Sequence, residues 1–129
     1  MDRGQLHETI NQMLEAEFDR REMIERLNRF RQTQAPPRKP DQFENLADFL
    51  NFYEAKSRYE AERQSLQNRR KKAKKSYNEA ERMLRSILPE NTPLHYDYEG
   101  NRQDLAGQRF TIVNQDRTIM FSSSGPPSR

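Results

Sequence analysis

The chain has 129 residues, of which 32% are hydrophobic and 33% are charged, and its formal net charge is +3. This length supports one domain, or one elongated hairpin with an appendage, and the composition is too polar for a thick globular core. The absence of cysteine excludes disulfide bonds, thiol catalysis and cysteine-based zinc sites. No segment approaches the roughly 18 apolar residues of a membrane-spanning helix, and residues 1–10 do not resemble a signal peptide.

The first predicted helix covers residues 5–31. Its apolar residues recur mostly at intervals of three and four, on one side of the helix: Leu6, Ile10, Met13, Leu14, Phe18, Ile24, Leu27 and Phe30. Asp2 is a candidate cap for the first turn. Residues 32–40 contain three prolines, which break a helix because proline lacks the amide donor. We therefore expect the tip of a helical hairpin at 32–40.

The second predicted helix covers residues 41–88 and contains no proline or glycine. An apolar or small residue recurs in it at every seventh position: Phe52, Tyr59, Leu66, Ala73, Ala80 and Ile87. Asp41, followed three residues later by Glu44, resembles a capping box, and Pro89 ends the helix. A helix of this length needs a partner along its side. The heptad repeat therefore predicts an antiparallel coiled-coil hairpin over residues 1–88.

The hairpin also has a predicted register. Alignment of the two apolar patterns across the tip pairs Leu27 with Phe49 and Ile10 with Leu66. In that register the N-terminal end of the first helix lies opposite Arg70, and the second helix extends beyond it by about four or five turns. The apolar residues of this extension then need another cover: Tyr77, Ala80, Met83, Leu84 and Ile87.

Residues 89–122 are predicted to supply that cover as a three-stranded antiparallel β meander. Three short segments alternate apolar and polar residues or are rich in β-branched and aromatic ones: 94–98, 109–113 and 118–121. Residues 114–117 form the predicted second turn, and 123–129 a flexible tail. The predicted fold class is therefore α+β, with the meander docked on the end of the second helix.

A basic collar occupies residues 69–75, where six of seven residues are basic: Arg69, Arg70, Lys71, Lys72, Lys74 and Lys75. At about 100° per residue these side chains surround the helix and leave only Ala73 in a gap. One interpretation is a site for nucleic acid or another polyanion, or a nuclear import signal. The other is a solvated stretch of charged helix that serves solubility or intramolecular salt bridges. Residues 56–85 carry a net charge of +7 against −2 for residues 1–30, a difference that would favour pairing of the two helices.

Aromatic residues gather at the start of the second helix. They cover more than one helical face, so a two-helix pair cannot bury all of them. An exposed apolar patch usually marks an interaction site. The candidate partner-binding residues are therefore Phe43, Phe49, Phe52 and Tyr53. The alternative is that these large side chains only close the hairpin tip.

No constellation in the sequence predicts catalysis or metal binding. His7 and His95 lack metal-ligand spacing, and there is no glycine-rich phosphate loop. Glu15, Glu17 and Asp19 are expected to form a charged, solvated helix face. We expect no cofactor and no small-molecule substrate.

Two tyrosines are expected to serve packing. Tyr96 and Tyr98 share one face of a predicted strand, so they should pack against Met83 and Leu84.

The sequence therefore favours a non-enzymatic protein-interaction, adaptor or assembly module of the cytoplasm that self-associates or binds another protein. The alternative is a nucleic-acid-binding accessory protein that uses the basic collar, with a nuclear location in a eukaryote. No membrane partner is expected, because no apolar insertion face accompanies the charge.

Overall fold

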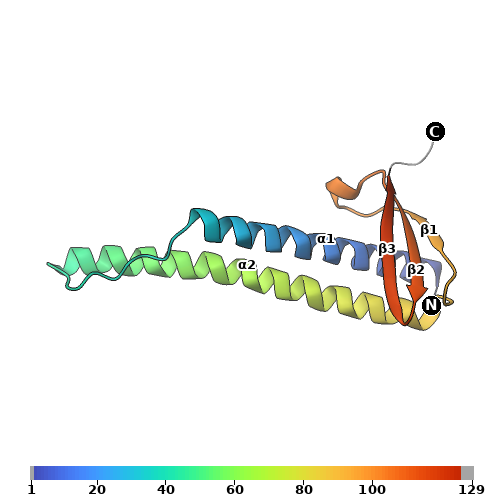
Figure 1. Ribbon diagram of the computed structural model, residues 1–129, viewed down its shortest axis with the longest axis horizontal. Coiled ribbons are helices and arrows are strands. Elements are labelled where there is room, and N and C mark those ends of the chain that lie inside the picture. Colours follow the sequence, from blue (N-terminus) through green and yellow to red (C-terminus); the bar gives the residue numbers. More distant parts are fainter. Residues whose placement is uncertain (1, 126–129) are drawn as a thin grey trace. The chain divides into compact units, whose positions relative to one another are not determined.

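The computed structural model describes residues 2–125. Two long helices precede a three-stranded antiparallel sheet (Figure 1), in the order α1 (Arg3–Thr33), α2 (Leu46–Ile87), β1 (Leu94–Asp97), a 3₁₀ turn η1 (Gln103–Leu105), β2 (Arg109–Gln115) and β3 (Thr118–Gly125). The predicted α+β class, with a helical hairpin and a small β meander, is confirmed.

The caps of the two helices differ in how well the sequence predicted them. The Asp2 side chain accepts a hydrogen bond from the Gln5 amide at 2.8 Å, and the Gln5 side chain accepts one from the Asp2 amide at 3.1 Å. This reciprocal pair caps α1 as expected. The predicted start of the second helix at Asp41 is wrong, because α2 begins at Leu46 and the Asn45 side chain accepts from the Asp48 amide at 2.9 Å. Residues 41–45 are instead an irregular segment.

The chain forms two compact units, and each helix contributes to both. One unit comprises Met1–Phe18 and Ala73–Arg129, and the other comprises Asp19–Lys72. We refer to them as the sheet unit and the tip unit. The boundary near residue 88 that the sequence predicts, between the hairpin and the meander, stays a prediction.

In the sheet unit, β2 is the central strand, and its inward face packs on the two helix ends. Phe110 and Ile112 of β2 are completely buried, together with Leu14 of α1 and Leu84 of α2. Burial of such side chains is worth about 1.5–3 kcal/mol each and is the main force that holds the sheet on the helices. The predicted docking is thus confirmed for Tyr77, Ala80 and Leu84, which belong to or border this core. It is wrong for Met83 and Ile87, which are exposed.

The hairpin between β2 and β3 closes through a two-residue turn. Gln115 pairs with Thr118, and the residues between them, Asp116 and Arg117, have φ values of 50° and 60°. Positive φ at both central positions is the type I′ geometry that matches the twist of paired strands. β3 continues to Gly125, so the part of the predicted flexible tail at 123–125 is strand. The rest of that predicted tail, residues 126–129, lies outside the described residues.

The predicted register of the two helices is wrong by about twelve residues, or roughly three turns. In the tip unit, Asp19 pairs with Arg69 at 3.6 Å, and the rings of Phe30 and Tyr59 lie 4.9 Å apart. In the sheet unit, the Gln12 side chain donates to the Ser76 carbonyl at 3.0 Å. A heptad repeat is compatible with several shifts, and the twelve-residue connection 34–45 is long enough to permit this one. The first turns of α2 therefore extend beyond the end of α1.

Candidate protein-interaction surface

The first two turns of α2 carry a row of exposed apolar side chains, which we call the apolar stripe. Leu46 is 71% exposed, Phe49 41%, Leu50 44% and Tyr53 57%. Their spacing of three, one and three residues places them within a band about 100° wide on one side of the helix. A helix usually packs against another helix through an apolar stripe of this kind.

The stripe is exposed because α1 ends before it. The last ring contact of α1 is that of Phe30 with Tyr59, and beyond this level the irregular connection follows α2 in place of a helix (Figure 1). That connection covers only one side of α2. The ring of Phe43 meets the rings of Phe49 and Phe52 at centroid distances of 5.3 and 5.6 Å.

The four aromatic residues predicted to bind a partner are brought together. Phe43 and Phe52 are half-buried on the inner side of this cluster. Phe49 and Tyr53 stack at 6.2 Å and remain exposed on the outer side. The sequence analysis missed Leu46 and Leu50. Their spacing with Tyr53 was the available signal, whereas the heptad repeat through Phe52 indicates a different face of the helix.

Charges are unevenly distributed around the apolar stripe. Residues 41–54 contain four acidic residues and no basic ones: Asp41, Glu44, Asp48 and Glu54. Lys56 and Arg58 follow directly. All six side chains are exposed, and within residues 2–125 none of them forms an ion pair. The segment is therefore acidic before and across the stripe and basic after it.

The basic collar is only partly the exposed ring that was predicted. Ala73 is buried, Arg70 is half-buried and donates to the Gln67 side chain at 3.1 Å, and Arg69 pairs with Asp19. The prediction that the first helix ends at this level is wrong, because of the shift in register. Four exposed lysines remain without an ion pair among the described residues: Lys71, Lys72, Lys74 and Lys75.

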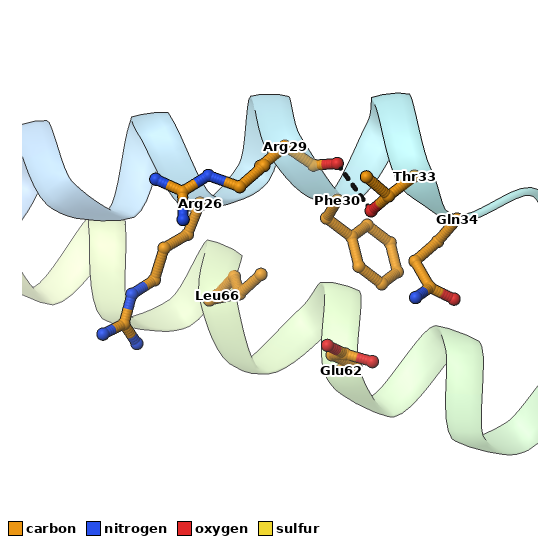
Figure 2. A pocket seen from close by; sticks show the side chains of 7 residues that line it. All are labelled: Arg26, Arg29, Phe30, Thr33, Gln34, Glu62 and Leu66. Carbon is orange, nitrogen blue, oxygen red and sulfur yellow. Dashed lines mark hydrogen bonds between the residues drawn. The ribbon is translucent and has the colours of Figure 1, made fainter.

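A shallow hollow of about 250 Å³ lies between the two helices of the tip unit (Figure 2). It is lined by Arg26, Arg29, Phe30, Thr33, Gln34, Glu62 and Leu66. The guanidinium groups of Arg26 and Arg29 are held by Glu22 and Glu25 on the same helix, at 3.0 and 2.6 Å. Figure 2 shows both groups turned away from the ring of Phe30. The other polar side chains that line the hollow are those of Thr33, Gln34 and Glu62.

The acidic residues of α1 are not the solvated face that the sequence suggested. Glu17 is buried, and Glu15 accepts hydrogen bonds from the Tyr98 hydroxyl at 2.6 Å and from the Asn101 amide at 3.2 Å. The Tyr98 hydroxyl in turn accepts from the Arg102 amide at 2.8 Å. These bonds fasten the chain that follows β1 to α1, which is a structural role.

The two tyrosines of β1 and its extension have perturbed acidities. Burial, and to a smaller extent the negative charge of Glu99, raises the pKa of Tyr96 to about 12. The Tyr96 hydroxyl donates a hydrogen bond to the Asn11 side chain. Burial, and to a smaller extent the hydrogen bond to Glu15, raises the pKa of Tyr98 to about 12. Both hydroxyls therefore stay protonated at neutral pH as donors to α1. Packing against Met83 was wrongly predicted, since Met83 is exposed, whereas Leu84 shares the core with both tyrosines.

The two histidines and Asp104 each lie beside a polar side chain. His7 lies 3.6 Å from Glu99, and His95 shares a 3.2 Å hydrogen bond with Thr111. The forked hydrogen bonds of Arg102, at 2.7 and 2.9 Å, lower the pKa of the exposed Asp104 carboxyl. Across residues 2–125 no group of three or more His, Cys, Asp or Glu side chains could hold a metal ion. Within the same range, neither long helix is apolar enough to cross a membrane.

Comparison of the chain with protein-family models, with curated proteins and with solved structures gave no match. Functional assignment therefore depends on the surfaces described above.

Proposed function

We propose that this chain is a non-enzymatic protein-interaction module, acting as an adaptor or assembly subunit, and that the apolar stripe is its binding surface. The observation that supports the proposal is the exposure of Leu46, Phe49, Leu50 and Tyr53 in one row on a regular helix. Apolar and aromatic side chains with this spacing are the anchors by which a helix docks in an apolar groove of a partner. In the isolated chain their contact with water is unfavourable, and a partner that covers them gains free energy.

A pull-down with a matched pair of variants tests this proposal. Leu46→Gln/Leu50→Gln removes two apolar side chains of the stripe and preserves helix propensity, because glutamine is a good helix former. Met83→Gln/Ile87→Gln is the control, since it removes two exposed apolar side chains with the same spacing from the same helix. In an extract of the source cell, proteins retained by the parent chain and by the control should be lost from the stripe variant. Equal retention by all three chains would contradict the proposal.

A second candidate function rests on the basic collar. The four exposed lysines, unpaired in the described part of the chain, favour attraction of a polyanion such as nucleic acid. On this alternative the chain is a nucleic-acid-binding accessory protein.

We propose that the protein is located in the cytoplasm or, in a eukaryotic cell, in the nucleus. The nuclear alternative rests on the density of lysine and arginine at 69–75, a composition typical of import signals. A fluorescent fusion of the chain, with and without the four lysines, tests the location. Exclusion of the parent fusion from both compartments would contradict it.

A further inference from the structure

We propose that the connection between the two helices carries a second binding site, a ligand for a protein domain with an aromatic-lined, acidic groove. The site comprises residues 36–40, with the sequence Pro-Pro-Arg-Lys-Pro, which we call the proline motif. It shares no residue with the apolar stripe. The inference therefore goes beyond the proposed function and does not depend on it.

The proline motif is predisposed to the polyproline II conformation. Each of Pro36, Pro37 and Pro40 has φ fixed near about −65°, and each directs the residue before it to the extended region. The peptide bonds before the three prolines are trans. Residues 34–40 are assigned to no helix, strand or turn, and Figure 1 shows them as part of an extended trace between the two helices. The segment is thus shaped for recognition as an extended ligand.

The main chain of the proline motif is available to a partner. Within residues 2–125, no amide or carbonyl group of residues 35–40 takes part in a hydrogen bond. Polyproline II has this property, because it makes no internal hydrogen bonds and its main chain stays solvated. Pro37 is half-buried, and the other four side chains of the motif are exposed. A partner can therefore reach both the side chains and the carbonyl groups.

The spacing of the prolines matches the pattern that proline-binding grooves recognise. Polyproline II has three residues per turn, so Pro37 and Pro40 lie on one edge, about 9 Å apart. The dipeptides 36–37 and 39–40 thus repeat along one side of the segment. Segments with the P-x-x-P pattern dock in aromatic-lined grooves, because the preformed conformation loses little entropy on binding.

The two residues between the prolines indicate the charge of the partner. Arg38 and Lys39 are exposed, and neither forms an ion pair within the described part of the chain. The next acidic residue, Asp41, follows the second dipeptide, so the proline motif itself carries two positive charges and no negative one. A groove bordered by aspartate or glutamate would attract these cations, whereas a basic border would repel them.

An array of purified SH3, WW and EVH1 domains, probed with the fluorescently labelled full chain, tests the proposal. These domains bind proline-rich segments through aromatic-lined grooves, and the parent chain should bind members whose groove is acidic. Pro37→Ala/Pro40→Ala should bind them at least about tenfold more weakly, because it removes both ridges and loosens the segment. Gln34→Ala/Gln42→Ala is the matched control and should bind as the parent, since it changes two exposed side chains of the same connection outside the motif.

A charge reversal, Arg38→Glu/Lys39→Glu, tests the motif with all its prolines in place and should also weaken binding at least about tenfold. A parent chain that binds no domain of the array would overturn the proposal, and so would proline and charge variants that bind as tightly as the parent. The prolines would then be only a rigid spacer between the helices.

The stripe variant Leu46→Gln/Leu50→Gln separates this inference from the proposed function. It should bind the array as the parent chain does, because the proline motif is intact in it. If it alone loses binding, the domains contact the apolar stripe and the proline motif is not their site.

Discussion

The side-chain amide of Asn114 in β2 donates a hydrogen bond to the main-chain carbonyl oxygen of Leu88 at 3.0 Å, and a second to that of Arg85 at 3.3 Å. The last carbonyl groups of a helix have no partner within it. A buried residue of the central strand thus caps the C-terminal end of α2, so the sheet and the helix end support each other.

Replacement of Asn114 by alanine should lower the free energy of unfolding by about 1–3 kcal/mol, because it removes the donor of two part-buried hydrogen bonds to main-chain carbonyl groups. The neighbouring Gln115 is exposed, so Gln115→Ala is the control and should change stability by less than about 0.5 kcal/mol. Urea unfolding measures both. Equal effects of the two substitutions would show that the cap contributes nothing.

Substitution of Gly100 by alanine should destabilise the sheet unit by about 1–3 kcal/mol. A β-carbon at this position would overlap the carboxylate of Glu15 and the hydroxyl of Tyr98, which are fixed by their mutual hydrogen bond. Gly4→Ala is the control, because its β-carbon would make an ordinary contact with Asp2. Thermal melting distinguishes the two, and a Gly100→Ala chain as stable as the parent would exclude the close packing at Glu15.

The stability of the protein should fall as the pH rises from 10 towards 12. Folding raises the pKa of Tyr96 and Tyr98 from 10.0 to about 12. Between these values the two hydroxyls ionise in the unfolded chain but stay protonated in the folded one, so unfolding is favoured. Tyr98→Phe should be less stable at neutral pH, since it loses bonds to Glu15 and Arg102, and less sensitive to alkaline pH. Urea midpoints that stay constant over this range would contradict the raised pKa values.

The sequence predicted the type of each long element because periodicity reports local structure. The proline-rich break, the heptad repeat and the alternating segments correspond to the turn, the helix and the strands. The helix register was not predictable in the same way. Register depends on the total apolar surface buried along both helices, and a regular repeat such as Tyr59, Leu66 and Ala73 fits several shifts.

The candidate site was predictable in part, because helix geometry is a local property that the sequence reports. The crowding of Phe43, Phe49, Phe52 and Tyr53 exceeded what one seam can bury, so exposure of some of them followed from helix geometry. Leu46 and Leu50 were missed because their exposure depends on where α1 ends relative to α2. The buried role of Glu15 depends on a tyrosine 83 positions away, which no local pattern reveals.

The basic collar can be tested with four substitutions: Lys71→Gln, Lys72→Gln, Lys74→Gln and Lys75→Gln. Arg69 and Arg70 are left in place because each has a partner within the tip unit. If the collar binds polyanions, the parent chain should bind a nucleic acid duplex with an affinity that falls steeply with salt, and the variant should not bind. Binding retained by the variant, or no binding by the parent at low salt, would contradict the polyanion site.

Labelling of an introduced thiol can show directly whether a partner covers the apolar stripe, because the chain has no cysteine of its own that would react. A thiol introduced by Leu50→Cys reports the stripe, and one introduced by Ser65→Cys reports an exposed position elsewhere on α2. In dilute purified protein both thiols should react with a maleimide at similar rates. In the native cell extract the thiol at position 50 should react with the maleimide severalfold more slowly, while the reaction rate of the thiol at position 65 should stay unchanged. Equal reactivity of both thiols in the extract would contradict the claim that the stripe is a binding surface.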